Sequence, residues 1–416
     1  MPDGLVIVGA SLAGLRAAQA ARREGFSGRI TLIGDEPHLP YDRPPLSKAY
    51  LAEDGEPDYF VAPEDLDEQD IAIRLSSRAT ELDPNAREVV LADASRVPFD
   101  KLIVATGASP RRLAIASDID GVVTLRTLDD ATRIRSRLRE GLDVVVIGAG
   151  FIGSEIASSA HVQGANVTIL EAAPVPLVRA VGEVVGAAIS GLHSRNGVRL
   201  VCGARIEAIR GETHVTEVVL ADGERIPADL VVVGIGAAPA TEWLVSSGIE
   251  LNPIDGGVVC DEYLESSIPG VFAAGDVTHW PNGLMDVTMR SENWTNAAEQ
   301  GARAGVNAIV EHKRAAFETV PYFWSDWYRS RIQFVGTASA DSVSFASGGP
   351  QEDKFVALYR SGDRLVGAAT LNEQRKIMKF RRLIQQRGSW DEALALLEQT
   401  SSSVLRMHAP EGNRSR

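Results

Sequence analysis

Two clusters of closely spaced glycines have the residue types and spacing that bind the diphosphate of a dinucleotide. They are Gly9-Ala10-Ser11-Leu12-Ala13-Gly14 and Gly148-Ala149-Gly150-Phe151-Ile152-Gly153. In such a cluster the first glycine forms a tight turn, the second lets the backbone approach the pyrophosphate, and the third allows close helix–strand packing. The phosphates then lie at a helix N-terminus, where N–H groups and the helix dipole favour negative charge. A chain with two such sites can hold two dinucleotides and pass electrons between them.

Each cluster is expected to lie between a buried strand and a helix, the context that makes the pattern specific. The predicted strands are 5–8 and 144–147, and the predicted helices are 15–23 and 154–162. The next strands, 29–33 and 166–170, lead to acids that can bind ribose hydroxyls, Asp35 or Glu36 and Glu171 respectively. Ser11 departs from the pattern, because it puts a small side chain where the backbone would approach the phosphates.

Length and composition are those of a globular protein. The 416 residues suggest roughly two to four domains, and 44% hydrophobic with 24% charged residues suits well-packed cores. No apolar run approaches the ~18–20 residues of a membrane span, and the first strand leaves no room for a signal peptide. A net charge of −14 argues against nucleic acid as a partner. We therefore expect a cytoplasmic protein that binds neither membrane nor nucleic acid.

Cysteine and histidine usage excludes two kinds of chemistry. The two cysteines, Cys202 and Cys260, form no C-x-x-C or C-x4-C pair, so a redox-active disulfide is not expected. This usage fits a reducing compartment, and we predict that both cysteines pack as small hydrophobic residues. The seven histidines lack ligand-like spacing, so no metal site is predicted.

The chain divides into four stretches with different textures. Residues 1–115 and 116–242 share one order: a glycine cluster, a strand-rich middle and an apolar strand ending in glycine, at 101–107 and 230–236. Residues 243–318 contain a strand at 271–273 and a helix at 294–310. Residues 319–416 are rich in aromatics, with a strand at 355–359, helices at 373–387 and 390–400, and a polar tail from His408 that is expected to be disordered.

Several short motifs in a fixed order carry a family resemblance. The most specific is Pro40-Tyr41-Asp42-Arg43-Pro44-Pro45-Leu46-Ser47-Lys48. The others are Ala105-Thr106-Gly107, Leu125-Arg126-Thr127, Gly234-Ile235-Gly236, Ala274-Gly275-Asp276 and Tyr322-Phe323-Trp324-Ser325-Asp326. Over nearly its whole length the chain resembles the FAD-dependent, NADH-using ferredoxin reductases of cytochrome P450 and Rieske oxygenase systems, the putidaredoxin reductase-like family.

Two positions depart from that family. Ala240 follows Pro239 where the family often has Asn, and Trp327 replaces a Gln after Ser325-Asp326. Trp327 is expected to alter the surface shown to the electron acceptor.

The resemblance implies a glutathione-reductase-like α/β fold with two Rossmann-type nucleotide-binding domains and a C-terminal α/β domain. Residues 1–115 and 243–318 would bind FAD, 116–242 would bind NAD, and 319–416 would form the C-terminal domain. The implied cofactor-binding residues are Gly9, Ser11, Ala13, Gly14, Asp35, Glu36, Arg43, Pro45, Lys48, Ala79, Ala105, Thr106, Gly107, Arg126, Gly148, Gly150, Phe151, Ile152, Gly153, Glu155, Glu171, Arg179, Gly236, Gly275, Asp276, Glu292, Asn293, Trp294 and Trp324.

Within this set the resemblance gives some residues particular roles. Arg126 would contact the FAD phosphates, Asp276 the ribityl chain, and the backbone around Trp294 the pyrimidine edge of the flavin.

Lys48 and Glu155 are the candidate catalytic residues. The task of such a protein is to align nicotinamide with flavin and tune the ring electronically, and hydride transfer needs no general base. The resemblance implies that Lys48 lies near the flavin and that Glu155 pairs with it beside the nicotinamide. The alternatives are a solvated surface lysine and a carboxylate that only complements a helix dipole.

Coenzyme choice depends on Glu171. A carboxylate there accepts hydrogen bonds from the ribose hydroxyls and repels a 2′-phosphate, which favours NADH. Arg179, eight residues further on, leaves NADPH open.

The partner side of the molecule is indicated by a basic run. Arg375, Lys376, Lys379, Arg381, Arg382 and Arg387 form either a solvated helix face or a docking patch for an acidic ferredoxin. The leading hypothesis is an NADH:ferredoxin oxidoreductase, a monomer or weak dimer, that passes electrons from FAD to a [2Fe-2S] ferredoxin. The alternatives are a rubredoxin reductase, a reductase dedicated to a dioxygenase, and an apoptosis-inducing-factor-like signalling flavoprotein.

Overall fold

The computed structural model describes residues 3–53, 55–116 and 119–407. Their contacts divide them into two units, each of which is treated by itself below. The first unit comprises residues up to 173 together with 198–319, and the second comprises 174–197 together with the residues from 320 onward.

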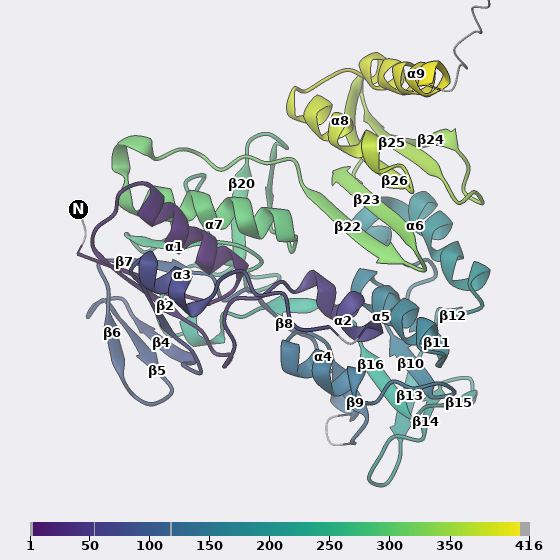
Figure 1. Cartoon of the computed structure of the whole chain (residues 1–416), viewed down its shortest axis with the longest axis horizontal. Helices are drawn as coiled ribbons and strands as arrows, with labels where there is room; N and C mark the ends of the chain where they lie inside the picture. The colour runs from purple at the N-terminus through teal and green to yellow at the C-terminus, as the bar shows by residue number, and fades with distance from the viewer. Residues whose placement is uncertain (1–2, 54, 117–118, 408–416) are drawn as a thin grey trace, which may run out of the picture. The chain divides into compact units, whose positions relative to one another are not determined.

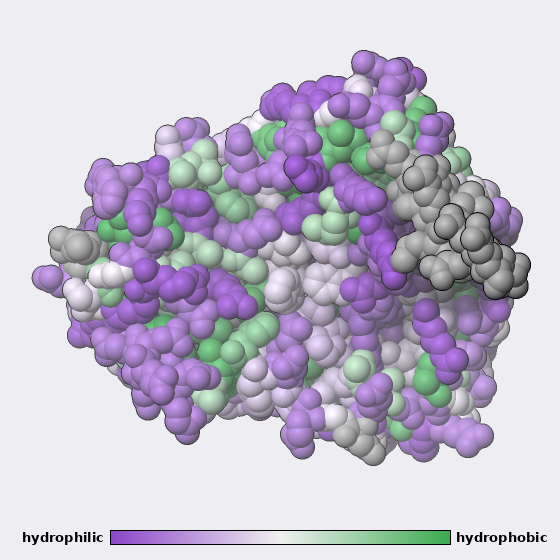
Figure 2. Space-filling view, turned by 45° about the horizontal axis from the view of Figure 1, so that its top comes forward, coloured by the Kyte–Doolittle hydropathy of each residue, from purple (hydrophilic) through white to green (hydrophobic). Residues whose placement is uncertain are grey.

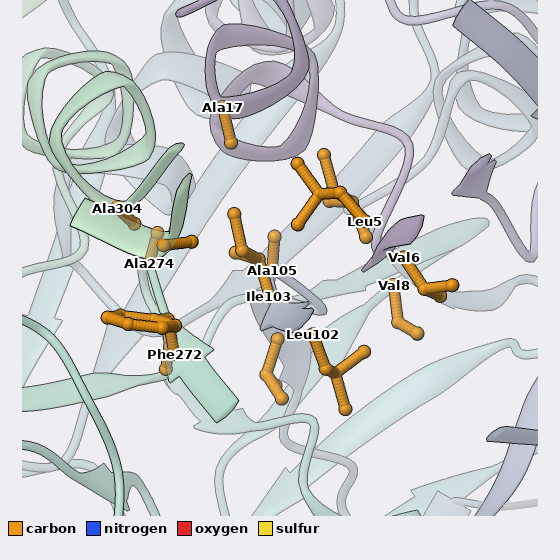
Figure 3. Close-up of a cluster of buried hydrophobic side chains, with 14 of the residues drawn as sticks. Leu5, Val6, Val8, Ala17, Leu102, Ile103, Ala105, Phe272, Ala274 and Ala304 are labelled. Carbon is orange, nitrogen blue, oxygen red and sulfur yellow. The ribbon is translucent and has the colours of Figure 1, made fainter. Parts of the chain in front are cut away.

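The first glycine cluster belongs to a five-stranded parallel sheet of the first unit (Figure 1). In spatial order its strands are β19 (Val271–Ala273), β7 (Lys101–Val104), β1 (Gly4–Val8), β2 (Arg29–Ile33) and β3 (Ile71–Arg74). Every residue of β1 is buried, as expected for a parallel strand covered on both faces. Side chains of β1, β7 and β19 meet those of helices α1 (Leu12–Arg23) and α7 (Trp294–Ile309) in one core (Figure 3).

Helices α1 and α7 approach each other unusually closely. A Cβ atom at Gly301 would lie 2.2 Å from the carbonyl oxygen of Ala13, and one at Gly305 would lie 2.3 Å from that of Ala17. Both distances are far below van der Waals contact, so only glycine fits. The axis of α7 is therefore fixed against the helix that follows the first glycine cluster.

The second glycine cluster belongs to a second parallel sheet of the same unit. Its strands in spatial order are β12 (Arg199–Cys202), β11 (Asn166–Glu171), β10 (Asp143–Ile147), β16 (Leu230–Val233) and β9 (Val122–Thr124). Helix α5 (Phe151–Val162) follows the cluster, and α4 (Leu128–Arg135) follows β9. The predicted strand–turn–helix context of both clusters is thus confirmed.

Four small sheets complete the first unit. Three have three strands: β4 (Ala79–Asp83), β5 (Glu88–Leu91) and β6 (Arg96–Pro98); β13 (Ile206–Arg210), β14 (Glu217–Leu220) and β15 (Arg225–Pro227); and β18 (Val258–Val259), β20 (Thr278–Asn282) and β21 (Val287–Met289). The fourth is a two-stranded antiparallel ribbon of β8 (Ala108–Pro110) and β17 (Ala237–Pro239). The chain leaves the first parallel sheet for the second through β8 and returns through β17.

Short helices lie in the connections of the first unit. They are the single-turn segments Pro44–Ser47, Ala114–Ala116, Glu242–Leu244 and Glu311–Lys313, and the α-helices α2 (Ala49–Ala52) and α3 (Pro63–Glu68).

The second unit is an antiparallel sheet with three helices. The strands run in the order β22 (Tyr322–Trp327), β23 (Ser330–Gly336), β26 (Arg364–Leu371), β25 (Phe355–Ser361) and β24 (Ser342–Gly348). The helices are α6 (Val178–Arg195), α8 (Gln374–Gln385) and α9 (Trp390–Met407). The predicted strand at 355–359 and the two predicted C-terminal helices are present, and the tail from His408 lies outside the described residues.

The face of the molecule shown in Figure 2 is largely polar. On the face shown in Figure 2, hydrophilic residues predominate and hydrophobic ones form small scattered groups. Among the described residues, the helices are all too short or too polar to cross a bilayer.

Both cysteines are free thiols. Cys260 is buried as predicted, but Cys202 is exposed at the end of β12, so the packing prediction was wrong for Cys202.

Candidate active site

The two outer glycines of the first cluster make contacts that leave no room for a side chain. A Cβ at Gly9, which has φ of 120°, would lie 2.0 Å from the carbonyl oxygen of Ala105, and one at Gly14 would lie 2.0 Å from that of Gly9. Helix α1 begins within the cluster at Leu12, with Ser11 as an N-cap whose hydroxyl makes no capping bond. Since the first N–H groups of a helix lack intrahelical partners, this turn is suited to binding a phosphate.

Arg43 supplies a partly buried cation beside that turn. Its guanidinium donates to Glu36 at 2.5 Å, to the Ser11 hydroxyl at 3.3 Å and to the Arg126 carbonyl oxygen at 2.6 Å. Burial by itself would lower the pKa of Arg43, but Tyr41 and Glu36 more than offset this and the net shift is upward. Arg43 therefore stays protonated next to the hydroxyl of Ser11, the residue that stands in place of the middle glycine.

The same contacts distinguish the two acids that follow β2. Glu36 accepts from Tyr41 at 2.6 Å as well as from Arg43, whereas Asp35 is exposed. Asp35 is thus the more accessible acid for a ribose, a choice that the sequence left open.

A buried ion pair connects the two glycine clusters. The Lys48 ammonium lies 2.8 Å from one carboxylate oxygen of Glu155, and the hydroxyl of Ser47 donates a short hydrogen bond to the other. Lys48 also donates to the Pro44 carbonyl oxygen at 3.1 Å. Glu155 lies in the first turns of α5 and is only 2% exposed. The pairing implied by the resemblance is therefore present, and Lys48 is not a solvated surface lysine.

Asp276 lies at the end of β19, close to the first turn of α1. The preceding Gly275 has φ of 81°, and a Cβ there would lie 3.2 Å from that of Ala13. The Asp276 carboxylate is 3.3 Å from the Arg126 guanidinium, and its backbone carbonyl accepts from Arg290 at 2.8 Å. These contacts hold a carboxylate and two cations next to the phosphate-binding turn.

Trp294 begins α7 and faces the segment that carries Lys48. Its indole Nε1 donates to Asp42 Oδ1 at 2.7 Å. The N-cap residue Asn293 makes no side-chain capping bond, and Glu292 is paired with Arg290 at 2.6 Å.

The second glycine cluster repeats the steric pattern of the first. A Cβ at Gly148 would lie 2.3 Å from the Gly234 carbonyl oxygen, and one at Gly153 would lie 2.1 Å from that of Gly148. Gly150 differs, because φ there is −70° and no protein atom lies within 4 Å of a Cβ. Steric contacts thus require the outer glycines, while the middle one leaves open space at the N-terminus of α5.

Glu171 is oriented by the backbone around this cluster. One carboxylate oxygen accepts from the N–H of Ala149 and the other from the N–H of Ala173, both at 2.8 Å. The carboxylate is therefore fixed beside the turn that would hold a diphosphate.

Comparisons with known proteins agree with this geometry. A family model described as pyridine nucleotide-disulphide oxidoreductase matches residues 3–301, and one described as reductase C-terminal matches 322–403. The chain is 36% identical to the ferredoxin–NAD(+) reductase component of the p-cumate 2,3-dioxygenase system of Pseudomonas putida, over 93% of this chain and 94% of that one. It is 34% identical to putidaredoxin reductase of Pseudomonas putida, over 92% of each chain.

A solved structure extends these matches to three dimensions. A chain in the crystal structure of the covalent putidaredoxin reductase–putidaredoxin complex superposes on this chain with a TM-score of 0.89. The two chains are 32% identical, and the match covers 96% of this chain and 99% of that one. The chain belongs to the ferredoxin–NAD(+) reductase family.

The residues of this ferredoxin reductase fit the two dinucleotides that the family uses. Gly9, Gly14 and the partly buried Arg43 lie together at the start of α1, and Gly150 leaves open space at the start of α5, as the diphosphate of a dinucleotide requires. Gly236, at φ of 95°, also has no protein atom within 4 Å of a Cβ. Among the described residues, no cluster of three or more His, Cys, Asp or Glu side chains could hold a metal ion.

The other expected site residues are distributed as follows. Ala105 and Thr106 follow β7, and Thr106 donates to the Ala240 carbonyl oxygen at 2.8 Å; Gly107 has φ of 70°. Phe151 and Ile152 begin α5, with Ile152 half exposed. Pro45 lies in the single-turn helix before Lys48, Ala79 begins β4, Arg179 is exposed near the start of α6, and Trp324 lies half buried on β22.

Trp327 does not have the surface role that its departure from the family suggested. It is fully buried, stacks on His193 with ring centroids 5.0 Å apart, and donates from Nε1 to Ser325 at 2.8 Å. That expectation was wrong because an indole buries more apolar surface inside the second unit than a glutamine could.

Three contacts of the site were not anticipated from the sequence. They are the Ser47–Glu155 hydrogen bond, the Asp42–Trp294 hydrogen bond, and a network in which Arg290 joins Asp255 at 2.7 Å to the Asp276 carbonyl. The serine lies within the motif at 40–48, which was a usable signal. The other two connect residues that are far apart in the chain and have no sequence pattern.

Proposed function

We propose that the protein takes reducing equivalents from NADH onto FAD and passes them singly to a [2Fe-2S] ferredoxin of an oxygenase system. The Lys48–Glu155 pair is the observation that carries this proposal. It joins the segment after the first dinucleotide cluster to the helix after the second, at the position where two redox rings would meet. Cys202 and Cys260 are free thiols in different parts of the chain, so they do not form a disulfide that could accept the electrons. This supports an acceptor outside the chain.

Particular residues would hold each dinucleotide. The turn at Gly9–Gly14, Arg43 and Asp35 would bind the ADP half of FAD, and Arg126 with Asp276 would line the path to the flavin. The turn at Gly148–Gly153 and the fixed carboxylate of Glu171 would bind NADH. Bound FAD would accept a hydride, which carries a pair of electrons, and release those electrons one at a time.

With both dinucleotides bound, Lys48 and Glu155 would be the residues at the reacting rings. The ammonium of Lys48 would supply a preoriented positive charge, which favours the reduced, negatively charged form of a flavin. Glu155 and the Pro44 carbonyl oxygen orient that ammonium, so no reorganisation is needed during transfer.

The deciding experiment uses the purified, FAD-loaded protein. Stopped-flow reduction is measured with NADH and with NADPH, followed by electron transfer to a panel of [2Fe-2S] ferredoxins and rubredoxins. We expect fast reduction by NADH and turnover with at least one ferredoxin. Turnover with rubredoxin alone would establish the rubredoxin reductase alternative, and slow reduction to a long-lived charge-transfer complex with no protein acceptor would establish the signalling alternative.

We further propose that α8 is the docking face for the ferredoxin. Its apolar residues Ile377, Phe380 and Leu383 are buried, whereas Arg375, Lys379 and Arg382 are exposed along its outer side. Two other members of the basic run have local contacts: Lys376 pairs with Glu373, and Arg381 donates to the Val320 carbonyl oxygen. An outward row of cations would steer an acidic partner at low ionic strength.

A charge-reversal series tests this face. Replacing Arg375, Lys379 and Arg382 by Glu should reduce the ferredoxin rate, most strongly at low salt, and leave NADH-to-dye turnover unchanged. The matched control is Lys354→Glu, an exposed lysine elsewhere in the second unit. Equal loss of both activities, or an equal effect of the control, would assign α8 to a solvated face.

The remaining expectations are consistent with this function. We propose the division into FAD segments 1–115 and 243–318, an NAD segment 116–242 and a C-terminal domain 319–416; its support is the pair of crossings at β8 and β17. The free thiols support a cytoplasmic location. Sedimentation analysis would test the proposed monomer or weak dimer.

A further inference from the structure

Helix α7 is fixed at its first residue by a side chain distant in the sequence. Trp294 donates from Nε1 to Asp42 Oδ1 at 2.7 Å, a contact between residues 252 positions apart. Further along, the same helix is fixed by the close approach of Gly301 to Ala13. Asp42 therefore links the first residue of α7 to the segment that precedes Lys48.

Asp42 is itself held rigidly by its backbone. Its N–H donates to the Asp58 carbonyl oxygen at 2.7 Å, and the N–H of Phe60 donates to the Pro40 carbonyl oxygen at 2.9 Å. Between them Tyr41 and Tyr59 form an antiparallel bridge. The carboxylate thus projects from a short paired segment and cannot follow the indole if the indole moves.

The charge of Asp42 acts on Lys48 as well. Burial raises the pKa of Asp42, the Trp294 hydrogen bond and the Lys48 ammonium lower it, and the neighbouring Asp58 raises it, with a net upward shift. Lys48 is also paired with Glu155 at 2.8 Å. Two carboxylates therefore act on one ammonium, and Asp42 adds a negative charge to this part of the site.

We propose that Asp42 is a positioning residue of the flavin site, which fixes the Trp294 indole through Oδ1 and whose negative charge makes the flavin harder to reduce. The inference rests on the proposed function, because it takes Lys48, Glu155 and Trp294 as flavin-side residues. A negative charge near a ring that gains electrons disfavours the reduced form, while a neutral side chain of the same shape does not. Asp42 then acts through electrostatics and through Trp294, without contact to the reacting atoms.

The test separates the charge from the hydrogen bond. Asp42→Asn removes the charge but keeps an acceptor, and Asp42→Glu keeps the charge but displaces the acceptor. Asp58→Asn is the matched control, because it removes an exposed carboxylate from the adjacent segment. Two quantities are measured in each protein: the two-electron midpoint potential of bound FAD, and the indole N–H signal of Trp294 in a proton–nitrogen correlation spectrum, identified among six indoles by its loss in Trp294→Phe.

We expect Asp42→Asn to shift the flavin equilibrium toward the reduced form by about tenfold, because a unit negative charge is removed from a partly buried position, where charges are screened less than in water. For a two-electron couple this corresponds to about 30 mV. Asp58→Asn should leave the potential unchanged. Asp42→Glu should leave the potential nearly unchanged and move the Trp294 signal, in apoprotein as in the loaded protein.

Each outcome decides between these ideas. An unchanged potential in Asp42→Asn, or an equal shift in Asp58→Asn, refutes the electrostatic role. An unmoved indole signal in Asp42→Glu refutes the positioning role. If Asp42→Asn does not fold, Asp42→Ser removes the same charge and its midpoint potential tests the electrostatic role, while the indole signal of Asp42→Glu tests the positioning role. A parent protein that retains no FAD would refute the proposed function instead.

Discussion

The ion pair between Lys48 and Glu155 should be strongly coupled, which a double-mutant cycle can measure. At 2.8 Å the two charges attract by about 6 kcal/mol at an effective dielectric constant of about 20, and burial of Glu155 offsets part of this. Removing either partner leaves a largely buried charge uncompensated, which typically costs about 3–5 kcal/mol. We therefore expect Lys48→Met and Glu155→Gln each to lower the free energy of unfolding by about 3 kcal/mol.

The double variant should lose much less than the sum of the two. Because neither charge remains, the expected coupling free energy is about 2–3 kcal/mol. Urea unfolding at a fixed FAD concentration measures this coupling free energy, with flavin and tryptophan fluorescence recorded together as the signals of unfolding. The control is the exposed pair Arg96 and Glu88, 3.0 Å apart with side chains 53% and 28% exposed, for which a coupling under about 1 kcal/mol is expected.

The same variants should also be slow in NADH-driven flavin reduction. Loss of one preoriented charge typically lowers such rates about a hundredfold or more, so both single variants should fall by at least that factor in stopped-flow measurements. Unfolding free energies that add to within about 0.5 kcal/mol, together with unchanged reduction rates, would refute the reasoning.

Three further predictions concern the coenzyme, pH and the glycine turns. Glu171→Ser should raise the KM for NADH about tenfold and lower that for NADPH, because the oriented carboxylate is lost; an unchanged ratio of kcat/KM values would contradict this role. Burial lowers the pKa of His193 from 6.5 to about 4, so the unfolded chain binds a proton more readily. The contribution of the neutral His193 to the free energy of unfolding is therefore complete above pH 6.5 and falls by up to about 3 kcal/mol as the pH is lowered toward 4. His193→Leu should flatten the dependence of Tm on pH, and parallel Tm curves for the parent and the variant would count against this. Gly153→Ala should lower the Tm of the apoprotein, since its Cβ would lie 2.1 Å from a carbonyl oxygen, whereas Gly150→Ala, with no atom within 4 Å, should not; equal Tm values would be the contrary result.

The sequence predicted those parts of the fold that local patterns encode. Both glycine clusters lie between the expected strands and helices, because tight turns, buried β-branched runs and alanine-rich helices are determined by nearby residues. The Lys48–Glu155 pair was also anticipated, but through resemblance and not from spacing. No local rule connects two residues separated by more than a hundred positions.

What could not be predicted depends on tertiary contacts. Glu36 is bound by Tyr41 and Arg43, which leaves Asp35 accessible, and this follows from how the segment folds back toward β2. The burial of Trp327 against His193 and the exposure of Cys202 likewise depend on which face of a strand is covered. Residue type suggested burial for Cys202, and the departure from the family pattern suggested a surface role for Trp327.

The ribbon of β8 and β17 has a consequence for protein engineering. Pro110 and Ala237 are directly paired across it, so the segment between them begins and ends at neighbouring points. Closing so small a gap needs only a short turn and little loop entropy. The same segment also carries α6, which belongs to the second unit, so a module that replaces the second parallel sheet needs adjacent termini and must retain α6.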